Sequence, residues 1–86
     1  MPAQTKKVTI EGVEYTFQRI PTREWMRLQE RCQDRRGNFS TERLASEVLE
    51  HIVVEPKVKI DDFEIPAVME EVVAEAYNFQ HGKKVL

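Results

Sequence analysis

The stretch IVVEPKVKIDDFEIPAVMEEVVAEAYNFQHG, from Ile52 to Gly82, decides the fold of this chain. Pro56 ends the helix that precedes it, because the residue before a proline avoids the α-helical region. Pro66 suits the first turn of a new helix, and Gly82 suits the position that follows its end. We therefore predict a helix over about residues 65–81, with a short extended link and a turn in front of it.

The predicted C-terminal helix carries a wide apolar stripe. Apolar residues recur there at helical spacing, and glutamates occupy most of the remaining positions. The stripe consists of Val68, Met69, Val72, Val73, Ala76 and Phe79, and its edge reaches Tyr77. It is broader than a hairpin and two short helices need for burial. We therefore expect its centre in the core and its Val73–Tyr77 edge at a partner.

Two shorter helices are predicted upstream of Pro56. Leu44, Val48 and Ile52 share one face of a helix over about residues 40–54. The segment TREWMRLQERCQDRR predicts a helix over about residues 22–36, which Gly37 ends. The apolar stripe of this helix is narrow and consists of Trp25, Leu28 and Cys32.

The N-terminal segment KVTIEGVEYTF alternates apolar and polar residues on both sides of Gly12. This alternation predicts a β-hairpin over about residues 6–19, with the glycine at its turn. A lone hairpin is marginal in water, so helices must cover its apolar face. We predict a single α+β domain over residues 1–86, with the hairpin packed against a bundle of about three α-helices. Two points stay open: a further edge strand at Val58–Ile60, and whether the hairpin packs on the third helix of its own chain or of a neighbour.

Composition and charge are those of a soluble globular domain. The chain has 86 residues, of which 41% are hydrophobic and 33% charged, and a formal net charge of −2. Its one cysteine, Cys32, cannot form an internal disulfide, which fits a reducing compartment. The first residues form no apolar signal segment, and no run approaches the ~18 apolar residues that span a bilayer. We therefore expect a cytoplasmic protein that does not enter a membrane.

No arrangement of residues predicts catalysis. The three glycines are isolated, so they form no phosphate-binding loop. Cys32 lies on an apolar helical stripe, as core thiols do, and Asp61 and Asp62 suit a turn. His51 and His81 show no cysteines or acids at the spacing of a metal site. The chain is therefore predicted to be a binding module and not an enzyme, with no catalytic residue, metal or cofactor.

Arginines recur every four residues along the first predicted helix. They form a basic row on one flank, which consists of Arg23, Arg27, Arg31 and Arg35. Three interpretations stay open: a solvated face, a surface for an acidic protein, and a nucleic-acid contact. The acidic total charge and the interspersed acids argue against nucleic acid. We expect self-association, in which the row meets the acidic third helix of a neighbouring copy at Glu70, Glu71 and Glu75.

Four apolar or aromatic residues are candidates for contact with a partner. Met26 points away from the Trp25 stripe, so it is either exposed or part of a second contact. Phe39, in the loop GNFS, is either a staple onto the next helix or an exposed anchor. Val73 and Tyr77 lie at the edge of the C-terminal stripe.

The C-terminal stretch resembles the tail assembly chaperones of long-tailed phages and prophages, most closely the small XkdN-like group. The shared pattern is a helix that ends in Val-Val, a Pro-Lys pair, a hydrophobic-Asp-x-Phe turn and an "EVV…A…F" helix. The matching residues are Val53, Val54, Pro56, Lys57, Ile60, Asp61, Phe63, Glu71, Val72, Val73, Ala76 and Phe79. A hairpin followed by a helix is also similar to that family, so the resemblance covers nearly the whole chain.

This resemblance implies a role in building the phage tail. Such chaperones coat the long, helical tape measure protein and keep it soluble until tail tube subunits displace them. The resemblance further implies a homo-oligomer or self-stacking protein in the cytoplasm of the bacterial host, absent from the mature virion. A small amphipathic domain that repeats along an elongated client suits this role, because many weak contacts add up through avidity.

A second hypothesis is a small DNA-binding or regulatory protein that uses the arginine row. Such a protein shows salt-dependent DNA binding that is lost when Arg27 and Arg31 are replaced by glutamate. A third hypothesis, an accessory subunit of an enzyme or an antitoxin, has no positive feature in the sequence.

Overall fold

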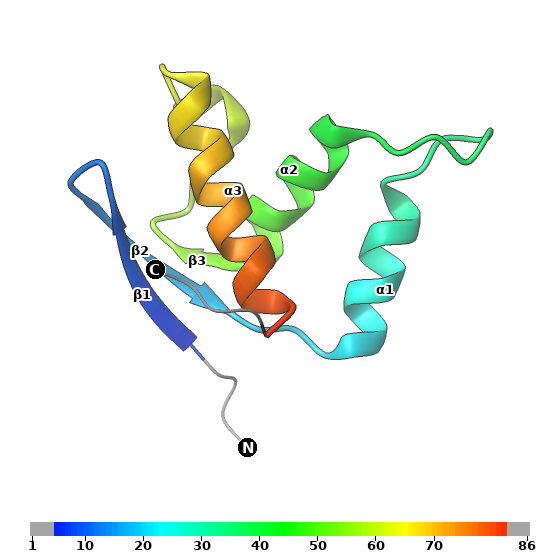
Figure 1. The fold of residues 1–86 in the computed structure, drawn as a ribbon, viewed down its shortest axis with the longest axis horizontal. Helices are drawn as coiled ribbons and strands as arrows, with labels where there is room; N and C mark the ends of the chain where they lie inside the picture. Colours follow the sequence, from blue (N-terminus) through cyan, green and yellow to red (C-terminus); the bar gives the residue numbers. More distant parts are fainter. Residues whose placement is uncertain (1–4, 83–86) are drawn as a thin grey trace.

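A computed structural model describes residues 5–82 and places three helices against a three-stranded antiparallel sheet (Figure 1). The strands are β1 (Thr5–Ile10), β2 (Val13–Gln18) and β3 (Val53–Glu55), in the order β1-β2-β3. The predicted α+β fold, with an N-terminal hairpin packed against three helices, is confirmed. The hairpin packs on helices of its own chain.

The hairpin turns over two residues, Glu11 and Gly12, which both have positive φ angles of 50° and 79°. This is the type I′ pattern, whose twist matches that of the flanking strands and favours glycine at the second position. Ile10 therefore pairs with Val13, and the register continues along both strands. One face of the hairpin is buried against the helices through Val8, Ile10, Tyr15 and Phe17.

The second helix, α2 (Thr41–His51), ends three residues earlier than predicted, and Val53–Glu55 forms β3. The pairing partner is β2, where Phe17 lies opposite Val53. The backbone N–H of Gln18 also donates to the carbonyl of Ile52 at 2.7 Å. β-Branched residues suit such a strand, and pairing satisfies the free edge of β2. The third strand of the sheet is therefore Val53–Glu55 and not Val58–Ile60, the segment that the sequence left open as an edge strand. Ile60–Asp62 forms a 3₁₀ turn, η1.

The first helix, α1 (Thr22–Arg31), ends five residues before the predicted end at residue 36. Asp34 is the cause, because its carboxylate accepts the backbone N–H groups of Arg36 and Asn38, both at 2.8 Å. Asp side chains that bind nearby backbone in this way compete with the helix. Gly37 lies within the resulting turn at a φ of 81°, and not at the helix end.

The third helix, α3 (Pro66–Gln80), agrees with the predicted range to within one residue at each end. Its residues Val72, Ala76 and Phe79 are buried, and the Phe79 ring lies 6.4 Å from that of Phe17 on β2. α1 adds Trp25 and Leu28 to the same core, and Cys32, the residue that follows the helix, lies there too. Burial raises the pKa of the Cys32 thiol, and its Sγ contacts the Leu28 carbonyl oxygen at 3.2 Å. This thiol has the environment of a core residue.

The last turn of α3 is fastened to the connection between β2 and α1, in an arrangement that we call the C-terminal clasp (residues 19–25 with 77–81). The Gln80 amide donates to the Ile20 carbonyl and accepts the Ile20 N–H, both at 2.8 Å. The Arg19 guanidinium donates twice to the Phe79 carbonyl, at 3.1 and 2.9 Å. The clasp holds α3 across the sheet by bonds between residues about sixty positions apart.

Replacing Gln80 by methionine is expected to lower the free energy of unfolding by about 1–3 kcal/mol, because it leaves two backbone groups of Ile20 without partners. Urea unfolding monitored by circular dichroism measures this difference. Gln33→Met is the matched control, since Gln33 is exposed and should change stability by less than about 0.5 kcal/mol. Equal stability of the two variants would mean that the clasp contributes nothing.

Candidate interaction groove

An apolar groove of about 440 Å³ lies between α2 and α3. Residues of both helices and of η1 line it: Thr41, Glu42, Leu44, Ala45, Ile60, Met69, Glu70, Val73, Ala74, Tyr77 and Asn78. Most of these side chains are apolar, and several of them are partly exposed. Partly exposed apolar side chains gathered in one concave surface are typical of a protein-binding site.

The groove exists because the apolar stripe of α3 is wider than the core requires. Val72 and Phe79 are buried in the core, whereas Met69, Val73 and Tyr77 pack only partly against it. Met69, Val73 and Tyr77 are spaced four residues apart, so they form one ridge about 12 Å long at 1.5 Å per residue. Leu44 and Ala45 of α2 form the opposite wall.

Tyr77 is held at one end of the groove by two aromatic neighbours. Its ring lies 5.4 Å from that of Trp25 in an edge-to-face arrangement, and 4.4 Å from the imidazole of His81. The Trp25 indole N–H in turn donates to Nε2 of His81 at 3.1 Å. Edge-to-face pairs restrict ring orientation, so this end of the groove is fixed before any partner binds.

A larger hollow of about 670 Å³ lies between α2 and residues 57–62. Charged side chains of both signs dominate its lining, and Lys57 Nζ already donates to the Glu50 carbonyl at 2.9 Å. Such a surface is well hydrated and gains little from contact with a partner. The smaller, apolar groove is therefore the better candidate for an interaction site.

The structure separates the four predicted partner contacts into two groups. Val73 and Tyr77 line the groove. Met26 is 58% exposed on α1, and Phe39 is 52% exposed on the connection between α1 and α2; neither lines the groove. Phe39 is therefore not a buried staple, and the role of both residues in partner contact stays a prediction.

The predicted arginine row does not continue along one helix. Arg35 lies beyond the end of α1, in the turn organised by Asp34, so the helical row consists of Arg23, Arg27 and Arg31. Arg31 donates to Glu47 Oε2 of α2 at 3.0 Å. On α3, Glu70 and Glu71 are exposed and Glu75 is partly buried. The shorter row leaves fewer cations for phosphate contacts than the sequence suggested.

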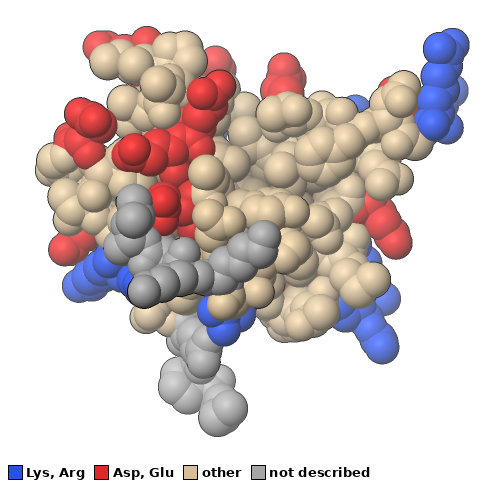
Figure 2. Space-filling model, in the orientation of Figure 1, with Lys and Arg blue, Asp and Glu red and all other residues tan. Residues whose placement is uncertain are grey.

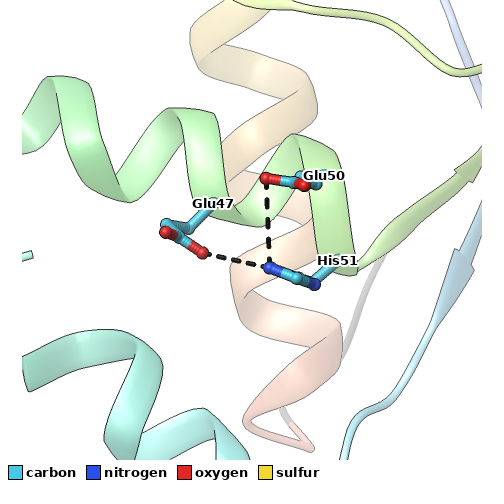
Figure 3. Close-up of side chains that lie close together, drawn as sticks. All are labelled: Glu47, Glu50 and His51. Carbon is cyan, nitrogen blue, oxygen red and sulfur yellow. Dashed lines mark ion pairs between the residues drawn. The ribbon is translucent and has the colours of Figure 1, made fainter. Parts of the chain in front are cut away.

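Glu47, Glu50 and His51 lie together on α2, where their donor atoms are within 4.8 Å of one another (Figure 3). The sequence prediction that His51 has no acids at the spacing of a metal site is therefore wrong, because positions i, i+3 and i+4 of a helix lie on one face. His51 Nε2 is 3.1 Å from Glu47 and 4.0 Å from Glu50. A metal ion at this place would compete with the Arg31 guanidinium for Glu47. The ion pair from Arg31 on α1 to Glu47, together with the contacts of His51 with Glu47 and Glu50 within α2, accounts for the cluster.

The hydrogen bond from Arg31 holds the pKa of Glu47 below its ordinary value of 4.5, and the charges of Arg31 and His51 act in the same direction. A carboxylate with a lowered pKa in the folded state stabilises the fold at neutral pH, and this contribution is lost as the pH falls through the lowered pKa. Glu47→Gln is therefore expected to have a lower melting temperature than the wild type at pH 7. The difference in melting temperature should become smaller as the pH falls. Thermal unfolding between pH 7 and pH 3 measures it.

Glu50→Gln is the control for this experiment, because the Glu50 side chain is 70% exposed and its carboxylate lies 4.0 Å from His51 Nε2. It should unfold like the wild type over the same pH range. An unchanged pH profile for Glu47→Gln would show that the pair with Arg31 does not form in solution.

Comparison with protein-family models, with curated proteins and with solved structures found no match to this chain. Among residues 5–82, no helix combines the length and the apolar character that a bilayer span requires. Function is therefore inferred from the groove, from the charge distribution and from the sequence resemblance.

Proposed function

We propose that this chain is a non-enzymatic tail assembly chaperone of the XkdN-like group, which binds and solubilises the tape measure protein during phage tail morphogenesis. The observation that carries the proposal is the apolar groove between α2 and α3. Its α3 ridge consists of Met69, Val73 and Tyr77, at positions i, i+4 and i+8. Apolar side chains at this spacing form a surface on which the apolar face of another helix can pack. The resemblance at Val53–Phe79 supplies the identity of the client.

The chemistry of the groove suits a chaperone more than an enzyme. Its lining is mainly apolar, and two carboxylates, Glu42 and Glu70, are the charged groups among the described residues that form it. A shallow apolar groove binds any helix with a suitable stripe at modest strength, and repeated copies along a long client add affinity. Release by tail tube subunits requires such weak individual contacts.

The charge distribution supports self-association along the client. Figure 2 shows acidic side chains gathered on the side of the hairpin and α3, and basic side chains mainly on the side of α1 and of the connection between α1 and α2, with single groups of the other sign on each side. This uneven distribution favours contact between copies, with Arg23 and Arg27 on α1 of one copy near Glu71 of the next, which does not line the groove. Light scattering at low and high salt tests this, because salt screens exposed charges. Assemblies that salt does not weaken, or none at any concentration, would contradict it.

The assigned setting follows from the same proposal. The protein acts in the cytoplasm of the bacterial host, before the tail tube forms around the tape measure protein, and is absent from the mature virion. Mass spectrometry of purified virions measures this absence directly.

Co-expression with the tape measure protein of the same phage tests the proposed function. The tape measure protein should be mostly insoluble alone and mostly soluble with the wild-type chain, and the two proteins should co-purify. The tail tube protein, added later, should release the chain from the complex. A tape measure protein that stays insoluble, or that is equally soluble without the chain, would contradict the proposal.

A further inference from the structure

The rim of the groove is acidic on both walls. Glu42 lies in the first turn of α2, and Glu70 lies on α3 across the groove. Both residues are exposed, and neither makes an ion pair with another described residue. No lysine or arginine of residues 5–82 lines the groove. A partner that binds in the groove therefore contacts an apolar floor between two carboxylates that have no ion-pair partner among the described residues.

The dimensions of the groove determine the form of its occupant. The ridge of Met69, Val73 and Tyr77 is about 12 Å long, which equals slightly more than two helical turns. A helix that fills this length presents three or four apolar residues at i, i+3 or i+4, and i+7. The residues that flank this stripe then lie above the two walls, as the e and g positions of a coiled coil lie beside its apolar seam.

Charge complementarity determines the flanking residues. Lysine or arginine at the flanks lays its aliphatic stem along the apolar wall and brings its charge to Glu42 on one side and Glu70 on the other. Aspartate or glutamate at the same positions is repelled from both walls. Nucleic acid is disfavoured for the same reason, because its phosphates would meet the same carboxylates.

A second copy of the chain fits the groove poorly. The most basic helix of the chain is α1, and Met26 is the one large apolar side chain exposed on it. One apolar residue fills one of the three or four positions that the ridge offers. A separate helix with a full stripe buries more apolar surface and is therefore the better occupant.

We propose that the groove between α2 and α3 selects a cationic amphipathic helix, with lysine or arginine on both flanks of a three- or four-residue apolar stripe. This inference rests on the proposed function and specifies which segments of the client are bound. It predicts that the chain binds those segments of the tape measure protein whose apolar stripe is flanked by lysine or arginine. Equally apolar segments flanked by aspartate or glutamate should not be bound.

Two synthetic peptides test the inference. Both have the same leucine stripe over about 18 residues, a length at which helices form in water. One carries lysine and the other glutamate at the flanking positions. Isothermal titration calorimetry with the wild-type chain should give at least about tenfold tighter binding of the lysine peptide at low salt. Added salt should reduce this preference, since the rim is exposed.

A charge reversal at the rim sharpens the test. In the double variant Glu42→Lys with Glu70→Lys, the preference should invert in favour of the glutamate peptide. The matched control is Glu24→Lys with Glu30→Lys, which makes the same change of net charge on the exposed face of α1 and should keep the wild-type preference. If the rim variant does not fold, the salt dependence of peptide binding to the wild-type chain tests the charge selection instead. The preference for the lysine peptide should then fall as salt is added.

The outcomes separate the inference from the function on which it rests. Equal binding of both peptides would overturn the charge selection and leave the apolar groove as a client site. No binding of either peptide, together with an insoluble tape measure protein, would overturn both. Self-association that blocks the groove and is not displaced by the lysine peptide would overturn the inference in favour of a second copy as occupant.

Discussion

Phe17→Ala is expected to lower the free energy of unfolding by about 3–5 kcal/mol, the cost of removing a large aromatic side chain from a packed core. Phe17 has 0% exposure, lies on the central strand β2 and packs against Phe79 of α3. A domain of this size has about 5–15 kcal/mol of stability in total. The variant should therefore be close to unfolded at 37 °C, which circular dichroism and urea titration measure.

Val13→Ala is the control for this experiment on the same strand. Val13 is 43% exposed beside the hairpin turn, so its truncation should cost less than about 1 kcal/mol. If Phe17→Ala were as stable as Val13→Ala, the hairpin would not be packed on α3 in solution.

Val73→Asp is expected to weaken client binding by about 30-fold or more, while the chain stays folded. Val73 lies in the middle of the groove ridge, where a hot-spot residue contributes about 2 kcal/mol or more. An aspartate there places an unpaired carboxylate against the apolar face of the client, next to Glu70. Val73 is only partly buried, so the change is compatible with folding. Calorimetry with the lysine-flanked peptide measures the loss.

Val13→Asp carries the same substitution to an exposed site that does not line the groove. It should bind the client like the wild type. Thermal unfolding of both variants shows whether they are folded. Retained binding in a folded Val73→Asp variant would exclude the groove as the client site, and would direct attention to Met26 and Phe39.

The sequence predicted those elements whose ends are set by local chemistry. α3 was predicted to within one residue because Pro66 and Gly82 mark its ends. The hairpin was predicted because its alternation and its turn at Gly12 are local features. Both cases depend on residues that are close together in the chain.

Errors occurred where a distant or competing bond decides the structure. The helical pattern continues through Ile52 and Val53, but pairing with β2 draws Val53–Glu55 into the sheet. The end of α1 depends on two hydrogen bonds to Asp34, which helical periodicity does not reveal. The clasp joins Ile20 to Gln80, and no local pattern shows which residues sixty positions apart will meet.

The sequence indicated the α3 wall of the candidate groove but not the α2 wall. The excess width of the α3 stripe identified Val73 and Tyr77, because a stripe wider than the core leaves an exposed edge. The opposite wall, Leu44 and Ala45, and the acidic rim at Glu42 depend on how α2 packs beside α3. Helix packing is set by the complete core, so periodicity within one helix does not determine it.

Nuclear magnetic resonance of the ¹⁵N-labelled chain can locate the surface that binds the client. A segment of the tape measure protein with an apolar stripe and basic flanks is added, and the shift of every backbone amide is followed. The largest changes are expected at the two walls of the groove, around Leu44 on α2 and Val73 on α3. Changes centred on Arg23 and Met26 of α1, or no changes at saturating peptide, would contradict it.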